Sequence, residues 1–196
     1  MPLSRRHWIF DMDGTLTLAA HDFQAFKQSH GLDPNRPILE QIPDLPLHRQ
    51  DEVRRELVEW EGGIADRAQR APGALPLLQH LQARNYQLAI LTRNTRDLAL
   101  RTLNAAGLRE FFPDPLVLGR GCAEPKPSPA GVLRILGQWE ASPTDAVMVG
   151  DYLFDLEAGR SAGVFTIYID RDRSRMWQDQ ADLSLTRLDQ LLGRNQ

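Results

Sequence analysis

Two aspartates stand directly after an apolar run near the start of the chain, in the stretch WIFDMDGTL. Asp11 and Asp13 share one side of the strand if its period of two continues through them. Gly14 follows at once, which permits a sharp turn and leaves backbone amides free to face an anion. In such a pair, one carboxylate can act as a nucleophile and the other as a general acid and base.

Two further apolar runs also end in polar residues. The run YQLAILT ends in Thr92, which Arg93 and Asn94 follow, and the run AVMVGD ends in Asp151. Asp155 comes four residues later, on the same face of the helix expected there. The carboxyl ends of parallel strands meet at one edge of a sheet, which is where ligands bind. We therefore expect these side chains to converge on one site.

Each of these residues also has an ordinary structural interpretation. Asp151 and Asp155 could simply favour a helix N-terminus, as acidic residues do. Thr92 could be a common strand-end threonine, and Asn94 competes with Thr95 as the cap of the next helix. It is their joint occurrence beside the Asp11 pair that favours a site.

A cluster of carboxylates calls for a cation. Two like charges ~4 Å apart repel by about 4 kcal/mol at an effective dielectric constant near 20. Oxygen ligands of this kind favour Mg²⁺, which takes one or two carboxylates and keeps positions for water and a phosphate. Lys126, in the stiff segment EPKPSP, could supply further positive charge. The sequence thus predicts a site for a phosphoryl group beside Mg²⁺.

Apolar strands alternate with helices over most of the chain, which predicts a parallel sheet covered on both faces. The fold class is α/β, with a three-layer, Rossmann-like, doubly wound parallel sheet as its core. The expected strands are residues 7–11, 86–92, 116–119, 146–151 and 164–169. The expected helices are residues 74–83 and 95–106, a helix capped by Ser128 with Pro129 at its first position, and residues 153–162 and 185–192.

Residues 18–70 interrupt this alternation and contain no convincing strand. Asp22 could cap a helix that runs to His30, and residues 48–70 form a long polar helix candidate. We interpret residues 18–70 as a small helical cap domain, with residues 1–17 and 71–196 as the α/β core. Residues 17–21 and 71–73 are the natural hinges, and His21 lies close to the first of them.

Composition limits the functional classes. The 196 residues have 42% hydrophobic residues and a net charge of −3, so the chain has a real core and lacks the basic field of nucleic-acid binders. No apolar run reaches the ~18 residues of a membrane span. With one cysteine and no visible signal peptide, we expect a cytoplasmic protein, monomeric or dimeric, that binds neither nucleic acid nor membrane.

Four segments, in this order, are similar to the motifs of the haloacid dehalogenase-like superfamily: DMDGT, LT at 91–92, KPSP at 126–129 and GDYLFD at 150–155. The resemblance covers residues 7–16 and about 72–170. The insertion resembles the helical cap of the phosphoglycolate phosphatase and beta-phosphoglucomutase branch, although it is shorter than is usual there. The resemblance implies a phosphatase that hydrolyses small phosphorylated metabolites, phosphoglycolate-like or sugar phosphates.

The resemblance also implies a role for each matching residue. Asp11 would form an aspartyl-phosphate, and Asp13 would protonate the leaving oxygen and then activate water. Lys126 would bridge Asp11 and the phosphate. The remaining roles are phosphoryl or substrate binding by Thr92, Arg93 and Asn94, and Mg²⁺ binding by Asp11, the Asp13 carbonyl and Asp151. Asp155 would complete the metal site by orienting a metal-bound water or Lys126.

Other functions stay open at this point. A phosphomutase would use the same chemistry but needs a cap that seals out water, which the short cap disfavours. A dehalogenase would leave Asp13 without a leaving oxygen to protonate, and a phosphonate hydrolase would depend on Lys27, the only cap lysine. A non-enzymatic phospho-acceptor or binding module could share the carboxylate cluster, but such receivers do not carry a long insertion after the first strand.

Overall fold

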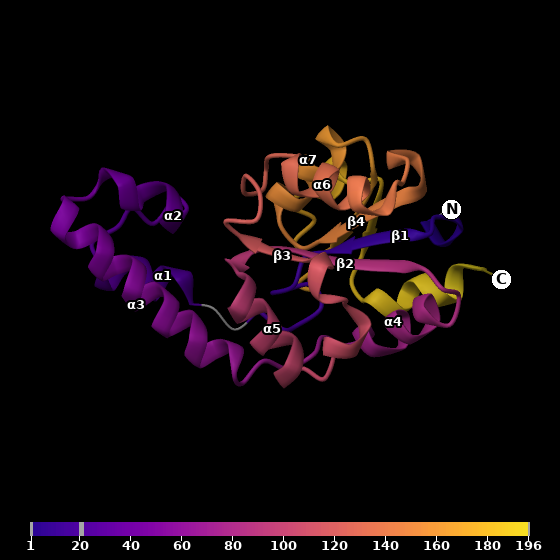
Figure 1. Cartoon of the computed structure of the whole chain (residues 1–196), viewed down its shortest axis with the longest axis horizontal. Coiled ribbons are helices and arrows are strands. Elements are labelled where there is room, and N and C mark those ends of the chain that lie inside the picture. The colour runs from indigo at the N-terminus through magenta and orange to yellow at the C-terminus, as the bar shows by residue number, and fades with distance from the viewer. Residues whose placement is uncertain (1, 20–21, 196) are drawn as a thin grey trace.

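The computed structural model describes residues 2–19 and 22–195, which form a six-stranded parallel sheet with helices on both faces (Figure 1). Its order is β3-β2-β1-β4-β5-β6. The strands are β1 (His7–Phe10), β2 (Gln87–Thr95), β3 (Val117–Arg120), β4 (Ala146–Gly150), β5 (Phe165–Ile169) and β6 (Leu183–Leu185). The predicted fold class is confirmed.

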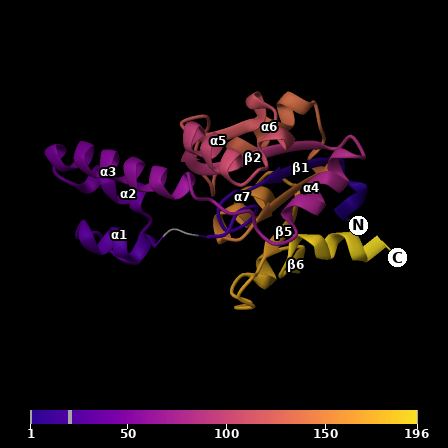
Figure 2. The same cartoon turned by 90° about the horizontal axis from the view of Figure 1, so that it is seen from below.

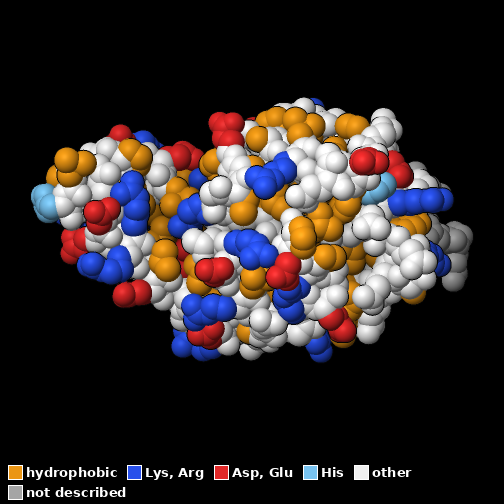
Figure 3. All heavy atoms as spheres, viewed as in Figure 1, with side chains coloured by type: hydrophobic (Ala, Val, Ile, Leu, Met, Phe, Trp, Pro, Cys, Tyr) orange, Lys and Arg blue, Asp and Glu red, His pale blue; other side chains and the backbone are white. Residues whose placement is uncertain are grey.

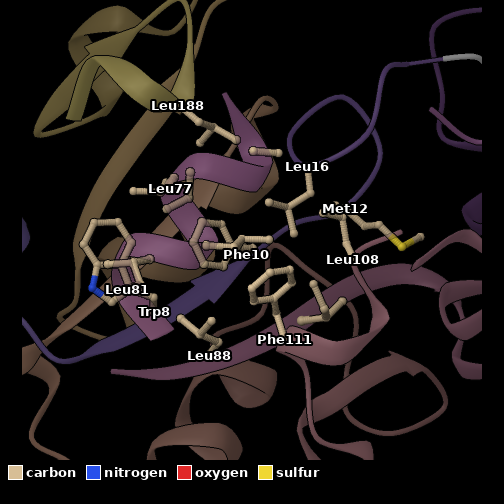
Figure 4. Packing of buried hydrophobic residues seen from close by; sticks show 14 of the residues in the cluster. Trp8, Phe10, Met12, Leu16, Leu77, Leu81, Leu88, Leu108, Phe111 and Leu188 are labelled. Atoms are coloured by element: carbon tan, nitrogen blue, oxygen red, sulfur yellow. The ribbon is translucent and has the colours of Figure 1, made fainter. Parts of the chain in front are cut away.

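The central strand β1 is buried on both faces, because its apolar residues alternate between two hydrophobic clusters. Trp8 and Phe10 face one cluster, with α4 (Ala74–Gln82), α5 (Arg96–Ala105) and the C-terminal 3₁₀ helix (Leu188–Asn195). Figure 4 shows their rings among leucines of α4. Ile9 faces the other cluster, with α6 (Ala130–Trp139) and α7 (Leu153–Ser161). This packing holds the end of β1 rigidly in the middle of the sheet.

The segment expected to form the cap is helical and has a hydrophobic cluster of its own. It contains α1 (Phe23–Ser29), α2 (Ile38–Gln41), a 3₁₀ turn (Ile42–Asp44) and α3 (Leu47–Ala65). Its buried residues are Phe26, Leu32, Ile38, Ile42, Val53 and Leu57. Figure 2 shows these helices beside the core, and Figure 3 shows hydrophobic and basic side chains where the two lobes meet. The division into a core and a cap domain stays a prediction.

The two stretches of chain that flank the helical segment pair with each other. Leu18 donates its amide to the Gln69 carbonyl at 2.9 Å, and Ala71 donates to the Leu16 carbonyl at 2.8 Å. The prediction that α3 continues to residue 70 is therefore wrong, since residues 69–71 adopt an extended conformation to pair with residues 16–18. Of the first predicted hinge, residues 20 and 21 lie outside the described part of the chain, and His21 with them.

Several other boundaries differ from the predictions. Strand β2 continues to Thr95 instead of ending at residue 92, with an irregular register against β3 between Leu91 and Thr95. Helix α6 begins after Pro129, although the Ser128 hydroxyl does accept a hydrogen bond from the Ala130 amide at 3.3 Å.

The C-terminal helix predicted over residues 185–192 is also wrong. Leu185 belongs to β6, paired with Ile169 of β5, because the alternating run LSL suits a sheet edge. The helical part that follows is 3₁₀ and starts only at Leu188.

The expected caps of two helices are confirmed. The Asp22 carboxylate accepts from the Ala25 amide at 2.9 Å, and the Thr95 hydroxyl accepts from the Leu98 amide at 3.3 Å. No helix among residues 2–19 and 22–195 is long and apolar enough to cross a membrane.

Candidate active site

The strand order itself fixes where the site lies. Chain connections from β1 go to one side of the sheet and those from β4 to the other, so a crevice opens between the carboxyl ends of these two strands. The Asp11 amide donates to the Val149 carbonyl at 2.8 Å, which aligns the two strand ends. Asp11 and Asp151 therefore leave neighbouring strands at the same level.

Three carboxylates meet at this crevice. Asp11, Asp151 and Asp155 each offer an oxygen, and these oxygens lie within 4.8 Å of one another. Asp151 follows β4, and Asp155 reaches the cluster from the first turn of α7, where it also accepts from the Tyr152 amide at 3.1 Å. These three side chains converge in the structure, as expected from the sequence.

Lys126 is the cation among these carboxylates and is almost completely buried. Its Nζ lies 2.6 Å from an Asp11 oxygen, 2.5 Å from an Asp155 oxygen and 2.8 Å from the Leu91 carbonyl. These contacts use all three hydrogens of the ammonium group. Burial opposes the charge, but the carboxylates of Asp11 and Asp155 hold the pKa of Lys126 above its usual value.

The folded protein disfavours the charged forms of two of these carboxylates, Asp151 and Asp155. Burial, reinforced by the charges of Asp11 and Asp155, raises the pKa of Asp151 well above its usual value. Burial also raises the pKa of Asp155 to about 6, although Lys126 opposes the shift. Each such shift means that the folded protein accepts negative charge here at an energetic cost.

The turn after Asp11 is shaped around Asp151. Gly14 has φ +86°, and a Cβ at this position would fall 2.1 Å from an Asp151 oxygen. The Thr15 hydroxyl donates to the other Asp151 oxygen at 3.1 Å. Behind the turn, Arg171 donates to the carbonyls of Gly14 (3.0 Å) and Thr15 (2.6 Å). The tight turn thus holds Asp151 from one side, and Arg171 fixes the backbone of the turn at Gly14 and Thr15.

Asp13 lies apart from the three-carboxylate cluster and has different partners. Its carboxylate accepts from the Asn94 side chain at 2.7 Å and from the Thr17 hydroxyl at 3.4 Å. Burial, followed by the charges of Asp11 and Glu61, raises the pKa of Asp13 to about 7. A carboxyl group in this state can both donate and accept a proton near neutral pH.

The three residues predicted to bind substrate form the irregular end of β2. Thr92 is buried, and its hydroxyl oxygen accepts from the Asn94 amide at 3.2 Å. The Asn94 side chain points to Asp13. The Arg93 side chain instead extends toward the cap, where it contacts Glu40 of α2 at 3.4 Å and lies over the Phe154 ring at 5.0 Å.

Two residues near this site were missed in the sequence. Glu61 of α3 is only 4% exposed and forms an ion pair with Arg120, the last residue of β3. Burial raises the pKa of Glu61, and Arg120 opposes the shift. Both residues could have been noticed in the sequence. Arg120 is a polar residue directly after the expected strand 116–119, as Asp151 is at the end of its own apolar run. Glu61 lies at helical spacing from buried Val53 and Leu57.

The residues present fit a Mg²⁺ ion. Asp11, Asp151 and Asp155 supply hard carboxylate oxygens at one point. Burial and neighbouring negative charges disfavour the charged forms of Asp151 and Asp155. A divalent cation would reverse both effects. The Asp13 carboxylate is not one of the three. Asp13 would therefore bind Mg²⁺ through its backbone carbonyl, the role that the resemblance implies.

The sheet order and this constellation define a hydrolase of one family, and comparison with known proteins agrees. The model of the haloacid dehalogenase-like hydrolase family matches residues 8–169. The chain therefore belongs to this family, and the predicted resemblance is confirmed.

One relative and one solved structure resemble the chain over most of its length, and a second relative resembles somewhat less than half of it. A haloacid dehalogenase-like hydrolase domain-containing protein of Arabidopsis thaliana is 30% identical over 174 residues, covering 83% of this chain and 69% of that protein. The pyrophosphatase PpaX of Bacillus velezensis is 37% identical over 89 residues, which is 45% of this chain and 41% of PpaX. A crystal structure of a predicted phosphoglycolate phosphatase from Haemophilus somnus superimposes with TM-score 0.80 at 20% identity, covering 98% and 99% of the two chains.

Proposed function

We propose that the protein is a Mg²⁺-dependent phosphatase that hydrolyses small phosphorylated metabolites through an aspartyl-phosphate on Asp11. The observation that carries this proposal is the contrast between two neighbouring aspartates. Asp11 is in contact with the Lys126 ammonium at 2.6 Å, whereas the pKa of Asp13 is raised to about 7. The ammonium group balances the charge of the Asp11 carboxylate and fixes one of its oxygens, and the raised pKa of Asp13 provides a proton for a leaving group.

The reaction would proceed in two steps at these aspartates. An Asp11 oxygen forms a bond to phosphorus as the bond to the leaving oxygen breaks, and protonated Asp13 gives that oxygen its proton. Asp13, now a carboxylate, takes a proton from a water molecule whose oxygen attacks the same phosphorus. The bond between phosphorus and Asp11 then breaks, releasing inorganic phosphate and restoring both carboxyl groups.

The surrounding residues position and neutralise the phosphoryl group. Thr92 lies at the end of β2 with its hydroxyl hydrogen available to a phosphoryl oxygen, and Lys126 balances the charge of Asp11. Asp11, Asp151 and the Asp13 carbonyl would hold Mg²⁺, which would offset the charge of the phosphoryl oxygens. Asp155 would orient Lys126, whose ammonium group it contacts at 2.5 Å, or a water beside the metal. Positioning and charge neutralisation supply most of the acceleration of phosphoryl transfer.

The substrate class rests on the relatives and on the small cap. PpaX is named as a pyrophosphatase, and the superimposed Haemophilus protein as a predicted phosphoglycolate phosphatase. We propose a substrate of that size for this chain as well, a small phosphate ester or anhydride.

The test is release of inorganic phosphate from a panel that includes pyrophosphate, phosphoglycolate, several sugar phosphates and p-nitrophenyl phosphate. Each compound is assayed with Mg²⁺ and with excess chelator, using the wild type and Asp11→Asn. We expect release that requires both Mg²⁺ and Asp11. Turnover by Asp11→Asn at the wild-type rate would refute the mechanism, and a sugar-phosphate isomer without free phosphate would point to a phosphomutase.

A further inference from the structure

The irregular end of β2 contains Thr92, Arg93 and Asn94, and we call it the Thr92–Asn94 loop below. It is held at its middle residue by an arginine from the neighbouring strand. The Nε of Arg120 donates to the Arg93 carbonyl at 3.0 Å. The next residue, Asn94, donates its side chain to Asp13 at 2.7 Å and its amide to the Thr92 hydroxyl. A shift of the Arg93 carbonyl would therefore move both a phosphoryl-binding group and the partner of the acid.

The same arginine is anchored by the cap. The Nη2 of Arg120 lies 3.0 Å and 3.3 Å from the two carboxylate oxygens of Glu61. Glu61 belongs to the long helix α3 and is only 4% exposed, so this carboxylate is committed to its partner. A buried charge of this kind is costly unless it is paired, and the pair is thus held in one geometry.

We propose that Arg120 is a positioning residue, which uses Nε to fix the Thr92–Asn94 loop and Nη2 to make that alignment depend on Glu61 of the cap. The proposal rests on the proposed function only in naming the reaction that is affected. It gives the end of α3 a task in catalysis without any contact between Glu61 and the substrate. When α3 occupies the position described here, Asn94 is aligned on Asp13.

A lysine could not replace this arginine. Arg120 uses two different nitrogens of a rigid planar group, one for the loop and one for the cap, whereas lysine offers a single nitrogen on a flexible stem. A substitution by lysine keeps the charge but loses one of the two contacts. This distinguishes positioning from simple charge balance.

A second ion pair provides a matched control for attachment of α3 to the core. Arg101 of α5 contacts Asp66, the C-cap residue of α3, at 2.6 Å and the Gly62 carbonyl at 3.3 Å. This pair also joins the cap helix to the core, but it makes no contact with residues 92–94 among the hydrogen bonds of the described residues. Arg101→Gln therefore loosens the helix without releasing the loop directly.

The experiment compares Arg120→Gln, Arg120→Lys, Glu61→Gln and Arg101→Gln with the wild type. The kcat and KM for p-nitrophenyl phosphate are measured at saturating Mg²⁺, and the folded fraction of each variant is checked by thermal unfolding. We expect kcat of Arg120→Gln to fall about tenfold or more, since small misplacements of reacting groups have effects of this size. We expect a similar fall for Arg120→Lys, a smaller one for Glu61→Gln and almost none for Arg101→Gln.

Amide hydrogen exchange over residues 92–95, measured without substrate, gives a second readout that does not depend on turnover. We expect faster exchange in Arg120→Gln than in Arg101→Gln. Full activity of Arg120→Lys, equal losses in Arg120→Gln and Arg101→Gln, or unchanged exchange in Arg120→Gln would overturn the proposal. If the wild type released no phosphate, the proposed function would fail, and the exchange rates alone would decide whether Arg120 positions the loop.

Discussion

Replacing Lys126 by methionine tests the electrostatics of the site most directly. The substitution keeps an unbranched apolar side chain up to the ε position and removes the ammonium group that touches Asp11 and Asp155. It leaves three carboxylates whose nearest oxygens lie within 4.8 Å of one another. Two unit charges about 5 Å apart repel by roughly 3–4 kcal/mol at an effective dielectric constant near 20.

We therefore expect Lys126→Met to lower the free energy of unfolding by about 3–5 kcal/mol at pH 8 without Mg²⁺, the range found when one partner of a buried ion pair is removed. For a chain of this size, the melting temperature should fall by roughly 6–20 °C. Urea unfolding followed by circular dichroism measures the free energy. Lys27→Met is the control, because within the described part of the chain that ammonium donates to the Pro34 carbonyl alone, at 2.8 Å. It should change the free energy by about 0.5 kcal/mol or less.

The loss should shrink as the pH falls. With Lys126 present the pKa of Asp155 is already raised to about 6, and that of Asp151 is raised too. A carboxyl group with a raised pKa binds more protons in the folded than in the unfolded state between its two pKa values, so stability increases as pH falls through that window. Without the lysine these pKa values rise further, and the loss should be smaller at pH 5 than at pH 8. An equal loss at both pH values, or none at pH 8, would refute this reasoning.

Two other predictions concern the same crevice. Gly14→Ala should reduce kcat about tenfold or more by displacing Asp151, which phosphate release measures. Gly121 has the same φ of +86°, but nothing lies within 4 Å of a Cβ added there. Gly121→Ala should therefore affect only stability, by about 1–2 kcal/mol, which urea unfolding measures. Mg²⁺ at about 100 times its dissociation constant should stabilise the wild type by roughly 2.7 kcal/mol and Asp151→Asn by clearly less, with chelator reversing the gain; equal shifts of the melting temperature in both would argue against the metal site.

The position of the site could be predicted from the sequence because it depends on strand ends. Apolar runs that stop at Asp11, Thr92 and Asp151 can be recognised without knowing which strands are neighbours, since parallel strands all present their carboxyl ends to one edge. The alternation of faces also places buried Met12 between the two aspartates. What the structure adds is the order of the strands, which decides which of these strand ends are neighbours.

The partners of each side chain could not be predicted in this way. Asp13 accepts from Asn94 because β2 continues irregularly to Thr95, and that irregularity is a property of its pairing with β3. The sequence predicts that the long helix α3 reaches residue 70 because apolar residues recur at helical spacing from Val53 to Ile64. It ends earlier through the pairing of residues 69–71 with residues 16–18, a contact between segments far apart in the chain.

The three carboxylates explain why the site must be built on the most rigid part of the molecule. Their repulsion favours separation, and a flexible loop would relax by moving them apart. Here Asp11 continues a strand whose residues Trp8, Ile9 and Phe10 are completely buried. Asp151 lies close against Gly14 and accepts a hydrogen bond from the Thr15 hydroxyl, which it would lose if it turned away. The hydrophobic packing of the sheet thus holds the carboxylates together although their repulsion opposes it. A cation bound between them would relieve that repulsion, and this would favour its binding.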